Sequence, residues 1–121
     1  MTQAALLMGS GLSASAARHI VGTTQSGLTA TGTTQADALA LTDVNEFTTV
    51  ASGTGGLIPL GCNRGDDIFV YNIGANTLTV YPPVGESINA LSANAGFSVA
   101  TAKTCIFRKV SPTRWVTNLT A

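Results

Sequence analysis

Two stretches between Asp67 and Pro83 alternate inward and outward side chains, the period of a pleated strand with one buried face. The residues between them, 72–76, place a glycine between two asparagines, which tolerate the positive φ of a short loop. Two prolines then stop the ladder, because proline has no backbone N–H to donate. This pattern predicts a β-hairpin whose buried face carries four aliphatic residues: Ile68, Val70, Leu78 and Val80.

Shorter strand patterns recur after residue 35, with turn signals about every ten residues. Pro59 suits a strand at the edge of a sheet. The spacing predicts an all-β fold, either an antiparallel β-sandwich or a small barrel of the jelly-roll kind. The expected strands are 36–42, 46–52, 57–60, 87–91, 97–100, 103–110 and 114–119, and the side chains expected at or near the core are Leu39, Leu41, Ile88, Leu91, Phe97, Val99, Cys105 and Phe107.

Residues 1–35 differ in kind from the rest, since they contain one arginine, one histidine and no acids. Ser13 is a suitable N-cap and Gly22 a suitable C′ residue for one short helix. The Thr-rich stretch that follows is either an extended arm that adds to a neighbour's sheet or a flexible linker. We expect an N-terminal anchoring arm, 1–35, and an oligomerisation domain, 36–121. The anchoring residues share one helical face: Leu12, Ala16 and Ile20.

Composition points to packing against other chains. Charged residues make up 10% of the 121 residues, against roughly 25% in an average soluble domain. A surface poor in charge suits close contacts between subunits, because few charges must be desolvated. The alternative is a monomer with a Thr-rich surface. The net charge is zero, so we expect neither nucleic acid nor a membrane as partner.

The supply of catalytic and metal-binding groups is thin. His19 is the single histidine and falls in the arm, away from the predicted strands. Acids at positions 43, 66, 67 and 86 could hold a cation, but adjacent aspartates before a strand more commonly hold a turn. Cys62 and Cys105 lack zinc spacing. In a cytoplasm they are expected to be free thiols, whereas in an oxidising compartment they could pair. We therefore expect no catalytic residue, no metal and no cofactor.

Four aromatic residues are candidates for a contact surface. Phe69, Tyr71 and Tyr81 point away from the predicted buried face and are too apolar for a solvent face on a monomer. Trp115 begins the last strand and is expected at a subunit interface. The alternative is that Trp115 and Tyr81 stack on a sugar ring.

Three segments carry a family resemblance: Gly32–Gly55, with TTQADALALTDVNEF, then Ala75–Leu91, with LTVYPPVGESIN, and Phe97–Trp115. In their order they resemble the small β-rich virion modules of tailed bacteriophages and prophages, which are head decoration, head-fibre and tail-fibre proteins. The resemblance implies a symmetric building block, expected to be a homotrimer, without active-site residues.

On that resemblance we expect a capsid decoration protein or head-fibre base that docks on the phage head. Its partners would be copies of itself and the major capsid protein or another virion protein. Its location would be the virion, after synthesis in the bacterial host cytoplasm. The alternative is a tail-fibre or receptor-binding module that contacts host glycans. A small hydrolase or lyase is disfavoured, because no positioned base is evident.

Overall fold

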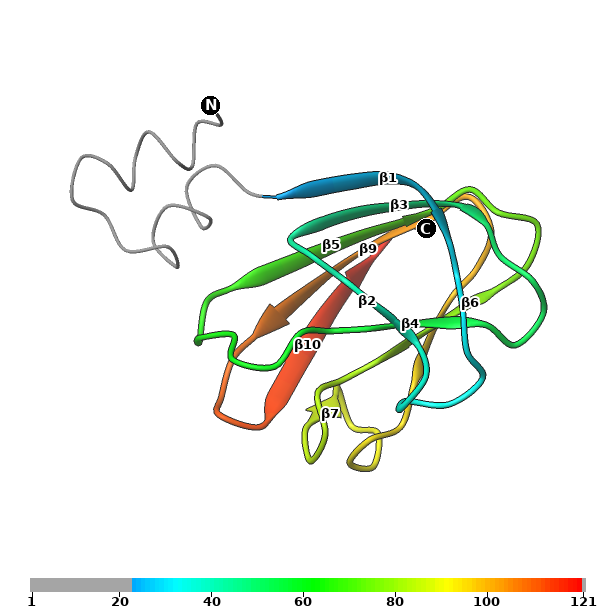
Figure 1. Cartoon of the computed structure of the whole chain (residues 1–121). Helices are drawn as coiled ribbons and strands as arrows, with labels where there is room; N and C mark the ends of the chain where they lie inside the picture. Colours follow the sequence, from blue (N-terminus) through cyan, green and yellow to red (C-terminus); the bar gives the residue numbers. More distant parts are fainter. Residues whose placement is uncertain (1–22, 121) are drawn as a thin grey trace.

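The computed structural model describes residues 23–120 (Figure 1). The all-β prediction is confirmed over this range: it contains strands and no helix, and so no helix that could cross a membrane. The predicted N-terminal helix lies outside the described residues. The strands are β1 (Thr24–Thr29), β2 (Leu39–Ala40), β3 (Val44–Thr49), β4 (Gly55–Leu57), β5 (Asp67–Asn72), β6 (Leu78–Tyr81), β7 (Ser87–Ile88), β8 (Phe97–Val99), β9 (Lys103–Lys109) and β10 (Arg114–Leu119).

The chain alternates between two sheets. The six-stranded sheet has the order β1-β3-β5-β9-β10-β7, and the four-stranded sheet has the order β2-β4-β6-β8. In both, the early strands pair in parallel: β1 with β3 and β3 with β5, and β2 with β4 and β4 with β6. The first six strands therefore wind as three coils, one strand in each sheet per coil, in a solenoid-like arrangement. β8 and β9 then add antiparallel to β6 and β5.

The predicted hairpin is wrong, although both of its strands exist. β5 belongs to the six-stranded sheet and β6 to the four-stranded sheet, so the loop between them crosses from one sheet to the other. Buried Asn72 shapes this crossing: its amide donates to the carbonyls of Asn76 and Val99, both at 2.9 Å, and its Oδ1 accepts from Gly74 N at 2.9 Å. Gly74 is required because a Cβ there would lie 2.6 Å from Val50 Cγ2.

The prediction of an antiparallel sheet is wrong for the coiled part of the chain. Alternation of apolar and polar residues shows which side chains face inward. It occurs in parallel and antiparallel strands alike, so it does not indicate strand direction. The edge prediction for Pro59 is also wrong. β4 ends at Leu57 and lies between β2 and β6, and Pro59 follows the strand.

The predicted arm needs correction where the structure describes it. β1 falls within residues 1–35, yet it pairs with β3 of the same chain, with Thr24 opposite Val44. Residues 24–29 are therefore a strand of this chain's own sheet and not a flexible linker. The boundary expected after Gln35 therefore falls between β1 and β2, inside the first coil.

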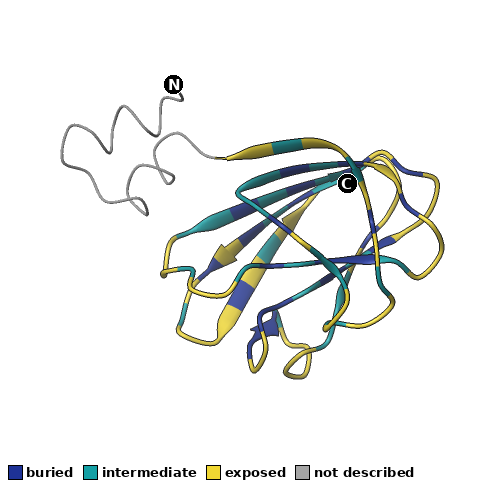
Figure 2. Cartoon of the chain, in the orientation of Figure 1, coloured by how far each residue is buried: buried dark blue, intermediate teal, exposed yellow. Residues whose placement is uncertain are grey.

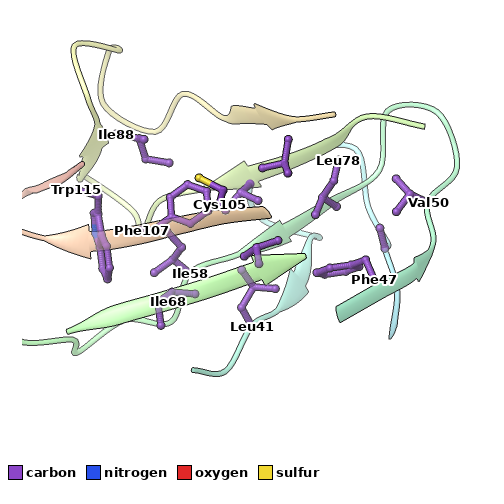
Figure 3. Packing of buried hydrophobic residues seen from close by; sticks show 14 residues of the cluster. Leu41, Phe47, Val50, Ile58, Ile68, Leu78, Ile88, Cys105, Phe107 and Trp115 are labelled. Atoms are coloured by element: carbon purple, nitrogen blue, oxygen red, sulfur yellow. The ribbon is translucent and has the colours of Figure 1, made fainter. Parts of the chain in front are cut away.

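One hydrophobic core takes side chains from both sheets (Figure 3). The inward positions predicted for the strands around residues 68–80 are confirmed, as are Leu41, Ile88, Val99, Cys105 and Phe107. Leu39 and Phe97 are partly buried and pack against the core, and the Phe97 ring meets the Phe107 ring edge to face at 5.8 Å. The prediction that Leu91 lies at or near the core is wrong: it follows β7 in a turn and is exposed.

Candidate interaction surface

The outer face of the six-stranded sheet carries a group of partly exposed apolar side chains. The strand register places Val44, Phe69 and Ile106 side by side on β3, β5 and β9. Tyr71 lies two positions along β5, and Val116 of β10 lies opposite Arg108 of β9. We call these five residues the apolar sheet face: Val44, Phe69, Tyr71, Ile106 and Val116. The first four are of intermediate exposure and Val116 is exposed.

One ion pair lies beside the apolar sheet face. Asp67 and Arg108 are opposite each other on β5 and β9. Their contact is bidentate, Nε to Oδ1 at 2.7 Å and Nη2 to Oδ2 at 2.8 Å. This hydrogen bonding raises the pKa of the Arg108 guanidinium above its ordinary value. The two charges neutralise each other, so this part of the surface presents little net charge.

The structure brings together two of the four aromatics predicted for the interface. Phe69 and Tyr71 lie on the apolar sheet face. Tyr81 lies on the other sheet, where its hydroxyl donates to the carbonyl of Thr33 at 3.2 Å. Its ring rests against two glycines on neighbouring chain segments, since a Cβ at Gly55 or Gly96 would lie 2.9 or 3.1 Å from ring carbons.

Trp115 must be removed from the predicted interface and from the alternative sugar site, because it is fully buried within its own chain. Its indole N–H donates to Glu86 Oε1 at 2.9 Å. Lys109 Nζ lies 3.1 Å from the same oxygen and 5.9 Å from the indole centroid. All three side chains are almost wholly buried. The cluster is therefore a buried polar support for the core.

Sequence patterns gave no signal for this cluster. Lys109 occupies an inward position on β9, like Cys105 and Phe107. A charged side chain is not expected at an inward position, so the alternation pattern alone does not identify it. Its acidic partner comes from the turn before β7, far away in sequence.

The two thiols and the potential metal ligands do not form a reactive site in the described part of the chain. Cys62 and Cys105 are free thiols in the structure. Burial raises the pKa of the Cys62 thiol to about 11 and that of Cys105 to about 12, so both stay protonated at neutral pH. No group of three potential metal ligands gathers anywhere in the described part of the chain. His19 and the predicted anchoring residues Leu12, Ala16 and Ile20 lie outside it.

Comparison with known proteins gives one family. The model of the VID27 C-terminal WD40-like domain matches residues 13–109. No curated protein and no solved structure matches the chain. WD40 propellers are built from four-stranded blades, whereas the described strands form one six-stranded and one four-stranded sheet, both mixed in direction.

This match overturns the predicted resemblance to tailed-phage virion modules. VID27 is a eukaryotic family, so the functions of capsid decoration, head-fibre base and tail-fibre receptor binding are all corrected. The predicted virion location is corrected for the same reason. The error arose because short Thr-rich and Val-rich strands with Gly-containing turns are common to many β-rich proteins, so their order carries little family information.

Proposed function

The chain belongs to the VID27 C-terminal WD40-like domain family, and on this premise we propose that it is a non-catalytic interaction module that associates with itself through the apolar sheet face. We also propose that its two sheets form a sandwich, wound at the start as a short solenoid. One fold can carry many functions, so the function is inferred from the residues on the surface.

The observation that carries this proposal is the continuity of the apolar sheet face. Val44, Phe69 and Ile106 are adjacent across three hydrogen-bonded strands. Tyr71 follows Phe69 on β5, and Val116 of β10 lies diagonally from Ile106. All five side chains keep part of their surface exposed in the described chain. Scattered apolar residues are normal on a surface, but a contiguous apolar patch marks a contact site. Aromatic residues such as Phe69 and Tyr71 are enriched in such sites.

A second copy is the occupant that the charges favour. The Asp67–Arg108 pair is neutral as a unit, so two copies related by a two-fold axis bring no like charges together there. Glu46 is the acid nearest to Tyr71 along the register, and in this arrangement it lies at the rim of the contact, where water reaches it. A contact of this kind joins copies in pairs. The trimer expected earlier rested on the virion resemblance and is not carried forward.

The absence of catalysis is part of the same proposal. The buried polar side chains, Asn45, Asn72, Glu86, Ser87 and Lys109, all have hydrogen-bond or ion-pair partners within the described chain. We take these groups to hold the fold in place.

Sedimentation equilibrium of the full chain tests the proposal. Phe69→Thr/Ile106→Thr keeps β-branched residues in β5 and β9 while removing the apolar contact. We expect the weight-average mass to fall at least twofold relative to the unchanged protein at equal concentration. The matched control is Leu60→Thr/Val84→Thr, which removes two aliphatic side chains that are 80% and 75% exposed in turns away from this face. A mass unaffected by the first variant, with its fold intact, would contradict the proposal.

A further inference from the structure

The first coil leaves both of its strands at the margin of their sheets. β1 is the outermost strand of the six-stranded sheet and β2 the outermost strand of the four-stranded sheet (Figure 1). Both belong to the same coil, so the two edges lie at the same end of the solenoid. Within residues 23–120 no strand pairs with either outer edge. β1 is exposed along most of its length (Figure 2).

Near the opposite margin of the six-stranded sheet, a side chain covers the part of β10 that β7 leaves unpaired. β7 pairs with β10 at Arg114 and Trp115 only. Beyond this point Asn89, which follows β7 with φ of 52°, covers the edge. Its Oδ1 accepts from Thr117 N at 3.2 Å, and its Nδ2 donates to Thr117 Oγ1 at 2.9 Å. One margin is thus capped, and the margin at β1 is not capped in this way.

The open end also leaves part of the core incompletely covered. Leu28 of β1 and Leu39 of β2 pack against the core but keep intermediate exposure. Natural edge strands are protected by charged residues, proline or bulges. Neither β1 nor β2 contains a charged residue or a proline. Of the protective features named above, these two strands have only the register irregularity around Gly27, where φ is 67°.

We propose that the first coils of two copies stack end to end, β1 against β1 and β2 against β2, across a two-fold axis. The occupant must supply two strand edges at the spacing of the two sheets and apolar side chains between them. A second copy supplies both by symmetry, whereas a single extended peptide covers one edge and leaves the other open. Since both strands are uncharged, no like charges meet at the axis.

This contact is separate from the apolar sheet face, and it extends the self-association proposed above. A molecule with two different two-fold contacts forms assemblies larger than a dimer, either closed dihedral ones or open chains. Loss of either contact alone leaves dimers, and loss of both leaves monomers. The number of copies therefore reports on each contact independently.

The test is Ser26→Lys/Thr29→Lys in the full chain, measured by sedimentation equilibrium. Both side chains are exposed on β1, and lysine at an edge is the protection that natural strands use. We expect the mass to fall from a larger assembly to a dimer, and to fall further to a monomer when Phe69→Thr/Ile106→Thr is added. Thr101→Lys/Thr113→Lys, an equal charge change at exposed turn positions, serves as control.

Salt separates charge repulsion from misfolding. Repulsion between lysines at the axis is screened at about 1 M salt, where the Debye length is roughly 3 Å, so the mass of the Ser26→Lys/Thr29→Lys protein should rise again. If this variant keeps the mass of the unchanged protein, the end-to-end contact is wrong. If it falls from a dimer to a monomer while Phe69→Thr/Ile106→Thr has no effect, this inference stands and the apolar sheet face is wrong.

Discussion

Single residues show how differently two ion pairs contribute to stability. Lys109 and Glu86 are almost wholly buried, and Glu86 also accepts the Trp115 N–H. Arg108 and Asp67 have better hydrogen-bond geometry but lie largely in water. Removal of one partner from a buried pair leaves an unpaired charge without solvent, whereas an exposed group is resolvated.

Lys109→Met should therefore lower the free energy of unfolding by about 3–5 kcal/mol. Urea denaturation measures the change. Addition of Glu86→Gln should recover much of it, because glutamine is neutral and its carbonyl can still accept from Trp115. Arg108→Met is the matched control and should have a much smaller effect. Equal losses from the two methionine variants would mean that the buried pair is not structural.

The buried Cys105 thiol predicts a loss of stability at high pH. Its pKa is raised from 9.0 to about 12, so between these values the unfolded chain releases a proton that the folded chain keeps. The contribution is fully present below pH 9 and decreases as the pH rises toward 12. Denaturant titrations from pH 8 to 11 should show a shallower decline for Cys105→Ala than for the unchanged protein. Parallel declines would contradict this assignment.

At the scale of elements, alternation and pairing carry different information. Alternating residues identified both strands around the 72–76 loop and their inward faces, and the last strand, 114–119, has the predicted bounds. Pairing partners could not be predicted, because they depend on contacts between residues distant in sequence. The structure shows parallel neighbours such as Val44 and Phe69 where the sequence suggested hairpins. Trp115 was misplaced since its polar partner Glu86 is brought to it only by the fold.

The crossing after β5 depends on one side chain. Asn72→Ala removes three hydrogen bonds and leaves the amide of Gly74 and the carbonyl of Val99 to find other partners. We expect a loss of about 2–4 kcal/mol in unfolding free energy, since each unsatisfied buried group costs about 1–3 kcal/mol. Asn76→Ala, whose side chain makes one bond to the Val50 carbonyl, should cost less. The reverse order would show that Asn72 does not hold the crossing.

At the scale of the whole molecule, the protection of backbone amides from hydrogen exchange should increase with a strand's distance from the sheet margins. β5 and β9 lie at the centre of the six-stranded sheet, and β1 and β7 lie at its margins. Amide hydrogen exchange should be slowest in the two central strands. In Ser26→Lys/Thr29→Lys, β1 should exchange faster than in the unchanged protein, because its outer edge is no longer covered. Equal exchange of β1 in both proteins would contradict end-to-end stacking.

The coiled path of the chain also affects the order in which strand pairs form during folding. Parallel neighbours in the first coils are separated by roughly twenty to twenty-five residues, so each pairing closes a long loop before it gains a contact. β9 and β10 are antiparallel neighbours joined by a short turn, and their pairing is the most local in the described sheets. Folding should begin at this hairpin, and the coils should then be added to it one after another.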